Sequence, residues 1–220
     1  MNVLVIAAHP DDELLGAGGT VALHAEKGDN VCLAILCEGV SNRYEPEWRK
    51  QVIEQSRQAG AILGASEIVT MELPDQRLDT FAISVVAGYV EELVTKHKPE
   101  VVYTHFGGDV NADHRVLCEA VVIATRPYSA PFVREVLQFE TPSSTEWGTP
   151  SLMVPFHPSV FVDISGTLAK KVEAFGCYTA EVRSYPHPRS LEAVRDRARY
   201  WGSLSNCGAA EPFVPIRIRR

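Results

Sequence analysis

The chain has 220 residues, of which 45% are hydrophobic and 22% charged, and its formal net charge is −7. This composition is typical of a folded globular protein and excludes a largely disordered chain. The acidic balance disfavours nucleic acid, because neutralising phosphates needs clustered lysine and arginine, and no apolar stretch approaches the roughly 20 residues of a membrane span.

Apolar runs alternate with longer amphipathic segments through the first half of the chain, a pattern typical of βαβ units and a parallel sheet. The predicted strands cover residues 2–8, 30–37, 67–71 and 100–104. The predicted helices cover residues 14–27, 47–63, 81–98 and 113–125. Gly28 and Gly64 lie where the first two helices should end. We therefore expect an α/β fold with a Rossmann-like, mostly parallel sheet and helices on both faces.

The pattern changes after residue 126. Further strands are predicted over residues 133–139, 159–162 and 213–218, and further helices over residues 166–178 and 191–203. Residues 141–158, rich in Pro, Ser, Thr and Gly, predict a long loop of the kind that forms lids or binding elements. With no linker or internal repeat in view, we expect one domain, residues 1–220, that carries these elements as a C-terminal extension.

The most informative motif is A-H-P-D-D-E at residues 8–13, directly after the first predicted strand. Open α/β sheets place their ligand sites at the carboxyl ends of such strands. Pro10 turns the backbone sharply, so His9 and Asp12 can face one centre while Asp11 lies to one side, near a water held there. Adjacent carboxylates repel one another, so the pair indicates a cation. An acidic first helical turn would explain one acid but not His9.

A second motif, D-V-N-A-D-H at residues 109–114, follows the strand predicted over residues 100–104. Asn111 or Asp113 is a suitable helix N-cap, and His114 in the first turn would face the same sheet edge as His9. Two imidazoles and one carboxylate are the ligand set of a catalytic zinc with an open position. Zinc suits these ligands better than magnesium, although iron or another transition metal would also fit. Asp109 and Asp113 are candidates to orient the histidines.

Three alternatives stay open on the residues alone. Gly16, Gly18 and Gly19 suggest a non-catalytic nucleotide- or sugar-binding Rossmann-like protein, but the dinucleotide fingerprint needs its glycines at the immediate strand turn. We interpret them as positions of close helix–sheet packing. A metal-dependent phosphoesterase would use Asp109 and Asp113 to complete a two-ion site. A catalytically silent scaffold is the third alternative.

On these motifs, the chain resembles the PIG-L/LmbE family of zinc-dependent N-acetylglucosamine deacetylases. The first motif is the specific one, and D-H-R at residues 113–115 agrees with it. Weaker agreement extends through residues 62–64, 162–164, 170–171 and 210–213. The resemblance implies that His9, Asp12 and His114 bind zinc and that Asp11 is the general base.

The chain departs from the family at its second motif. Many members read His-Pro-Asp-His, whereas this chain reads Asn111-Ala112-Asp113-His114, so the histidine that assists electrostatically beside the aspartate is absent. Either Asn111 donates a neutral hydrogen bond instead, or another histidine supplies the cation. The candidates for that cation are His105, His157 and His187. With Asp11, we expect Asn111 and Asp113 to form the catalytic set.

The resemblance implies hydrolysis of an N-acyl group, most simply N-acetyl, from an amino sugar or a sugar-containing small molecule, with a linear rather than a peptide amide as the bond broken. Water activated by zinc would give its proton to Asp11 and attack the carbonyl. The candidate substrate-binding residues are Arg43, Arg49, His105, His157, His187 and Arg189. We expect a small-molecule partner, no nucleic acid and no membrane insertion, and the sequence leaves room for a homo-oligomer. Five scattered cysteines without a C-x-x-C pair, and no secretory signal, favour a cytoplasmic location.

Overall fold

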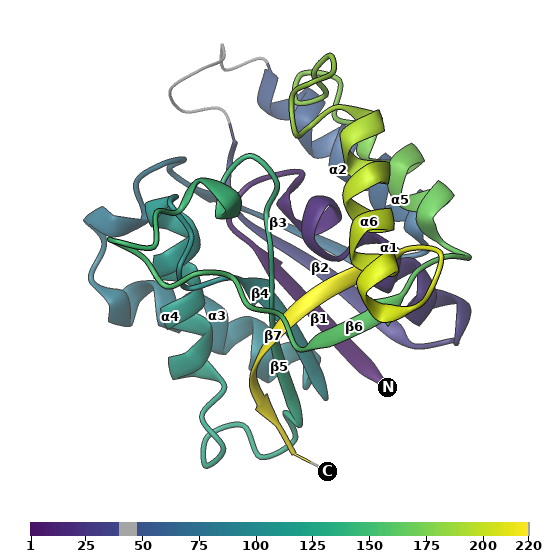
Figure 1. Cartoon of the computed structure of the whole chain (residues 1–220). Coiled ribbons are helices and arrows are strands. Elements are labelled where there is room, and N and C mark those ends of the chain that lie inside the picture. The colour runs from purple at the N-terminus through teal and green to yellow at the C-terminus, as the bar shows by residue number, and fades with distance from the viewer. Residues whose placement is uncertain (40–47, 220) are drawn as a thin grey trace.

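The computed structural model describes residues 1–39 and 48–219. Within them, seven strands form a sheet in the order β3-β2-β1-β4-β5-β7-β6. The strands are β1 (Asn2–Ala7), β2 (Asn30–Cys37), β3 (Glu67–Leu73), β4 (Val101–His105), β5 (Glu135–Phe139), β6 (Val160–Asp163) and β7 (Ala210–Ile218). The first five strands in chain order pair in parallel, whereas β7 runs antiparallel to both β5 and β6. The predicted α/β fold with a mostly parallel sheet is confirmed (Figure 1).

Helices cover both faces of this sheet, as the sequence predicts (Figure 1). The helices are α1 (Asp12–Glu26), α2 (Trp48–Leu63), α3 (Ile83–His97), α4 (Ala112–Ala124), α5 (Leu168–Phe175) and α6 (Leu191–Ser205), with short 3-10 helices η1 (Leu78–Thr80) and η2 (Thr145–Trp147). Leu4 and Ile6 of β1 pack with α3 and α4, while Val3 and Val5 pack with α1, α2 and α5. Both faces of β1 are therefore buried, which explains its unbroken apolar sequence. No helix in these ranges has both the length and the hydropathy of a membrane span.

Two glycines of α1 lie in close contact with the region of the sheet: Gly16 faces Phe139 of β5, and Gly19 faces Ile164, the residue after β6. A methyl group at Gly16 would overlap the ring of Phe139, and one at Gly19 would lie 2.7 Å from Ile164 Cδ1. Side chains at these positions would hold the helix away from its neighbours, so glycine is needed for packing. This supports the packing interpretation for Gly16 and Gly19, whereas an added Cβ at Gly18 would face Lys171 of α5.

The C-terminal extension differs in detail from the prediction. The closing strand starts at Ala210 rather than residue 213 and lies between β5 and β6. The helix expected over residues 166–178 is shorter, Leu168–Phe175, because turns occupy both flanks. A buried ion pair fastens this region to α1, since Lys171 Nζ lies 2.5 Å from Glu211 Oε1 and donates to Leu15 O at 2.8 Å. Glu211 also accepts from the backbone N–H groups of Gly19 and Thr20.

The strand order reverses between β1 and β4. From β1 the chain continues to β2 and β3 on one side, and β4 continues to β5 on the other. Ligands of open α/β sheets bind at such a switch point, outside the carboxyl ends of the strands. The first motif follows β1 and the second follows β4, so the topology brings both motifs to this switch point at one edge of the sheet.

Candidate metal centre and active site

Three side-chain atoms from the two motifs converge at this switch point. The distances are 3.1 Å from His9 Nδ1 to Asp12 Oδ2, 3.2 Å from His114 Nε2 to Asp12 Oδ2, and 3.3 Å between the two ring nitrogens. A tetrahedral zinc with bonds of about 2.0–2.1 Å holds its ligand atoms about 3.3–3.4 Å apart. The triangle therefore has the size that three ligands of one ion require.

Carboxylates behind both rings determine which nitrogens face this triangle. His9 Nε2 lies 3.0 Å from Asp113 Oδ2 and 3.1 Å from Asp75 Oδ1. His114 Nδ1 lies 3.2 Å from Asp109 Oδ1, at an angle too oblique for an ideal hydrogen bond. These acceptors favour protons on the outer nitrogens, which leaves His9 Nδ1 and His114 Nε2 as lone-pair donors toward one point. Lone pairs that face one another across about 3 Å fit a cation between them.

Hydrogen bonds keep Asp109 charged behind His114. Its carboxylate accepts from Ser144 Oγ, from Thr145 Oγ1 at 2.6 Å and from the backbone N–H of Asn111 at 2.8 Å. Burial alone would raise the pKa of Asp109, but His114 and these donors lower it to about 2. For Asp12, burial is likewise outweighed by the neighbouring imidazoles, which hold its pKa well below its usual range. Both carboxylates are therefore anions that can serve a metal centre.

His105 supports the site from below. Its ring stacks on His114 with a centroid separation of 3.8 Å and an interplanar angle of 14°. Its Nε2 accepts from the backbone N–H of Ala8 at 2.9 Å, and its Nδ1 lies 3.1 Å from Thr141 Oγ1. Burial lowers the pKa of His105 well below its usual value, so the ring is neutral. The structure thus places this residue beneath the site, and not on the wall where a substrate or oxyanion would contact it.

Asp11 has an unusual backbone conformation next to the ligands. It is the N-cap of α1 with φ 99° and ψ −29°, in the left-handed region that a non-glycine residue rarely adopts. Such residues cost about 1–3 kcal/mol and cluster at functional sites. The backbone N–H of Asp11 donates to Glu13 Oε2 at 3.1 Å, and its carbonyl accepts from Leu14 and Leu15. The turn sends adjacent carboxylates apart, Asp12 to the imidazoles and Asp11 to the cavity.

Glu13 fastens this turn rather than entering the cavity. It is fully buried, and Tyr178 Oη donates to its Oε1 at 2.7 Å. Burial raises the pKa of Glu13 to about 7, against the effect of the Tyr178 hydrogen bond. Glu13 therefore stabilises the turn, while Asp11 and Asp12 face the site.

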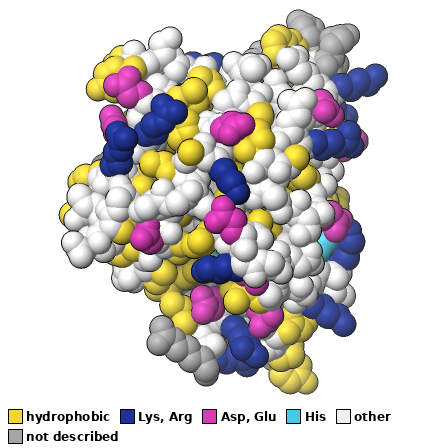
Figure 2. Space-filling model, turned by 90° about the vertical axis from the view of Figure 1, so that its right-hand side faces the viewer, with side chains coloured by type: hydrophobic (Ala, Val, Ile, Leu, Met, Phe, Trp, Pro, Cys, Tyr) yellow, Lys and Arg dark blue, Asp and Glu magenta, His cyan; other side chains and the backbone are white. Residues whose placement is uncertain are grey.

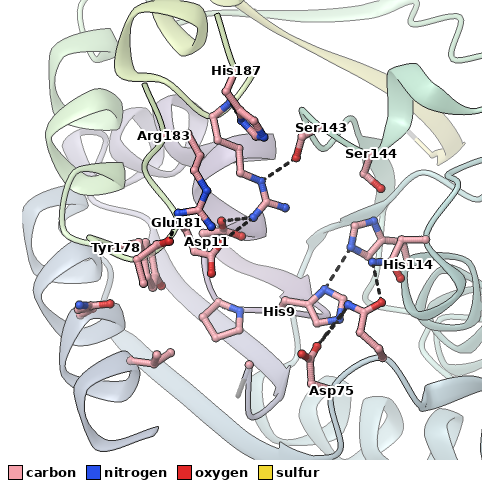
Figure 3. Close-up of a pocket in the computed structure, with 18 of the residues that line it drawn as sticks. His9, Asp11, Asp75, His114, Ser143, Ser144, Tyr178, Glu181, Arg183 and His187 are labelled. Carbon is pink, nitrogen blue, oxygen red and sulfur yellow. Dashed lines mark hydrogen bonds and ion pairs between the residues drawn. The ribbon is translucent and has the colours of Figure 1, made fainter. Parts of the chain in front are cut away.

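A cavity of about 440 Å³ opens over Asp11, His9 and His114 (Figure 3). Its walls come from both motifs, from the loop after β3, from the loop before η2 and from the segment between α5 and α6. Trp48 and Trp147 contribute aromatic surface to it. This volume is in the range of small-molecule sites.

The structure brings some of the predicted polar residues to this cavity and not others. His187, Arg189 and Asn111 line it. Asn111 is the N-cap of α4, since its side-chain oxygen accepts from the backbone N–H of Asp113 at 2.9 Å, and its Nδ2 lies 3.4 Å from Gln76 Oε1. Asp113 does not line it, because its carboxylate is behind His9 and accepts from the backbone N–H of Leu78.

The remaining predicted substrate-binding residues lie elsewhere. Arg49 forms ion pairs with Glu38, at 3.7 Å, and with Glu72, and it is absent from the cavity wall. His157 is exposed and also outside the wall. Arg43 lies outside the residues that the structure describes. Of the three candidate histidines, His187 lines the cavity in the described part of the chain, whereas His105 and His157 do not.

Several cavity residues were missed from the sequence. Asp75 and Gln76 follow the carboxyl end of β3, and the rule that located the two motifs would have found them. Tyr178, Glu181 and Ser143 come from irregular segments whose approach to the site has no local signal.

The fold and the site define a Rossmann-like protein with a cluster of histidines and carboxylates at its switch point. The family model described as PIG-L, GlcNAc-PI de-N-acetylase, matches residues 4–125, more than half of the chain. The chain belongs to this family.

The names of proteins similar to this chain include more than one activity. The uncharacterised deacetylase YaiS of Escherichia coli K12 is 27% identical over 174 residues, 74% of this chain and 82% of the relative. The 4-oxalmesaconate hydratase of Pseudomonas putida KT2440 is 28% identical over 82% of this chain and 74% of its own length. The diacetylchitobiose deacetylase of Thermococcus kodakarensis is 25% identical over 97% of this chain and 83% of its own length.

A solved structure also agrees with the fold across almost the whole chain. The crystal structure of a conserved protein from Thermus thermophilus superposes with a TM-score of 0.79 and 25% identity, covering 98% of this chain and 94% of that one.

Proposed function

We propose that this protein is a zinc-dependent deacetylase that removes an N-acetyl group from an amino sugar or a sugar-containing small molecule. The observation that carries the proposal is the triangle of His9 Nδ1, Asp12 Oδ2 and His114 Nε2 beside the Asp11 carboxylate. The family description and the two deacetylases among the relatives support the reaction. In this proposal residues 1–220 act as one deacetylase domain. The five free cysteines support a reducing, cytoplasmic location.

Zinc, held by His9, Asp12 and His114, would supply a Lewis acid that polarises the acyl carbonyl and acidifies water. Fe²⁺ would suit the same nitrogen and oxygen donors. Asp113 and Asp109 act behind the ligands, where they orient the two imidazoles. They are positioning residues and do not touch the substrate.

Asp11 is the proposed general base. Its carboxylate takes a proton from the attacking water and returns it to the amine nitrogen as the C–N bond breaks, which releases acetate and a free amine. Asn111 Nδ2 is the proposed donor to the carbonyl oxygen as negative charge develops there. The other end of the Asn111 amide is fixed by the helix cap, so the donor is held in place before the reaction.

His187 is the proposed donor to a substrate hydroxyl. Its Nδ1 accepts from the backbone N–H of Arg189 at 3.0 Å, which leaves the proton on Nε2. Partial burial and the neighbouring Arg189 and Arg183 lower the pKa of His187, so the neutral ring predominates at neutral pH. His187 would therefore bind as a hydrogen-bond donor rather than as a cation.

Hydration of an unsaturated carboxylate is a second candidate, favoured by the similarity to the Pseudomonas hydratase over most of both chains. The two-ion phosphoesterase gains less support. A second group of metal-ligating atoms in the described part of the chain, from His9, Cys37 and Asp113, shares His9 with the first group. Asp113 orients that ring, so the second group would compete with the first.

The test incubates the zinc-loaded protein with N-acetylated amino sugars and their conjugates and measures acetate by mass spectrometry. A parallel incubation with 4-oxalmesaconate measures addition of water.

Alanine at His9, Asp12 or His114 should abolish zinc retention. Asp11→Asn should keep zinc and lower turnover by about 100-fold or more, while Asp79→Asn, an exposed acid on η1, should match the wild type. Asn111→His should retain zinc. Full activity of Asp11→Asn would remove Asp11 from the base role, and hydration without acetate release would replace the proposed reaction.

A further inference from the structure

Arg189 joins three separate parts of the cavity wall. Its Nη1 lies 3.0 Å from Asp11 Oδ2 and 2.8 Å from Glu181 Oε2, and its Nε donates to Ser143 Oγ at 2.7 Å. Much of the donor capacity of the guanidinium is thus directed at protein acceptors. The interpretation of Arg189 as a substrate-binding residue does not account for these contacts.

The contacts fix Arg189 from several directions before any substrate is present. Its backbone N–H donates to His187 Nδ1, and the next residue, Ser190, is the N-cap of α6. Glu181 holds the guanidinium from the segment that follows α5, and Ser143 holds it from the loop before η2. Figure 3 shows Glu181 and Asp11 close together and Ser143 apart from them on a separate loop. A planar fork with several fixed bonds has little freedom to rotate.

The ion pair engages one oxygen of Asp11. Oδ2 is the atom within 3.0 Å of Arg189, and in the part of the chain that the structure describes no hydrogen bond or ion pair is directed at Oδ1. A carboxylate held by one oxygen presents its other oxygen in a defined direction. Together with the left-handed backbone of Asp11, this contact determines where a lone pair is available in the cavity.

We infer that Arg189 is a positioning residue that holds the Asp11 carboxylate in its orientation for proton transfer. The inference rests on the proposed function, because it assigns Asp11 the base role. Arg189 touches neither the three ligand atoms nor, in this role, the substrate. Its loss should therefore lower kcat and leave KM and zinc content nearly unchanged. Misplacing a reacting group by about 1 Å can cost on the order of 100-fold in rate.

The test compares Arg189→Ala and Arg189→Lys with Arg195→Ala, which removes the same charge from an exposed position on α6. We expect kcat of Arg189→Ala to fall by about 100-fold, with KM within about threefold and one zinc retained per chain. Arg189→Lys should lie between that variant and the wild type, because an ammonium keeps the charge but not the fork. Guanidinium chloride at tens of millimolar, far below the roughly molar range that unfolds proteins, should restore part of the rate of Arg189→Ala and leave Arg195→Ala unchanged.

A second readout is independent of substrate. Hydrogen exchange followed by mass spectrometry should show faster exchange in residues 10–15 and 141–147 of Arg189→Ala than of the wild type, and no change in Arg195→Ala. If the wild type hydrolyses no amide, the proposed function fails, but the hydrogen-exchange comparison still tests whether Arg189 holds these two segments in place. Unchanged exchange in Arg189→Ala overturns the inference, as does a loss confined to KM or a kcat equal to that of Arg195→Ala. If Arg189→Ala does not fold, Arg189→Lys carries both comparisons.

Discussion

Gly16→Ala should destabilise the protein although alanine favours helices. The gain in helix propensity is about 1 kcal/mol. Against it, the new methyl group would overlap Phe139, whose side chain is fully buried and whose ring packs on His105 with a centroid separation of 4.8 Å. Overpacking of this kind costs about 1–3 kcal/mol, and a ring enclosed on both sides places the cost at the upper end. The net loss is about 1–2 kcal/mol, which lowers Tm by roughly 2–8 °C in a chain of this length.

Calorimetry on the zinc-loaded protein measures this loss, with Gly88→Ala as the matched control. Gly88 is inside α3, and an added methyl group there meets no atom within 4 Å, so only the propensity gain applies and Tm should rise. Adding Phe139→Leu to Gly16→Ala should recover part of the loss, because it removes the overlapping ring. A Tm of Gly16→Ala equal to or above that of the wild type would refute the packing argument.

Three further predictions concern the buried charges and thiols. Asp113→Asn should weaken zinc binding by about 10–100-fold in a chelator competition, because His9 Nε2 loses one of the two carboxylates that orient it; unchanged affinity would contradict that role. Lys171→Met should lower Tm by roughly 6 °C or more, since an uncompensated buried carboxylate costs about 3–5 kcal/mol, and adding Glu211→Gln should restore most of it. At pH 8 a disulfide reagent should react with two thiols of the native protein and with all five after unfolding, because the other three are buried, whereas Cys177 and Cys207 are partly exposed. These protected thiols are Cys32, with a pKa of about 12, Cys118, with a pKa of about 11, and Cys37.

The convergence of His9, Asp12 and His114 could be predicted because its determinants are local. Each motif follows an apolar run, the first at once and the second after a few residues, and the parallel arrangement of those runs then brings the motifs together. The rule that polar residues after the carboxyl ends of parallel strands form the site also applies to β3. Asp75 follows the end of that strand and lies 3.1 Å from His9 Nε2. His105 shows a different error. The predicted strand stopped at residue 104, which left His105 as a free loop side chain, whereas it is the last residue of β4 and is buried under the site.

The contacts of Arg189 could not be predicted from any pattern in the chain. They depend on irregular segments before η2 and between α5 and α6, where neither helical nor strand periodicity determines direction. The closing strand was predicted too short for another reason. Pro212 directly precedes the predicted strand and argues against extending it, because proline cannot donate to a ladder. In the structure Pro212 lies in β7 and pairs with Phe161 of β6, while Pro215 pairs with Leu137 of β5 next to a register shift.

Figure 2 shows charged side chains of both signs scattered over one face of the molecule, with hydrophobic atoms between them.

Because β7 lies inside the sheet, the order of synthesis has a consequence for folding. A nascent chain carries His9, Asp12 and His114 once residue 114 has left the ribosome, but the outer edge of β5 has no neighbour until residues 210–218 are translated. An open strand edge is a template for pairing with other chains. C-terminal truncations should therefore yield aggregated protein rather than a soluble, inactive form.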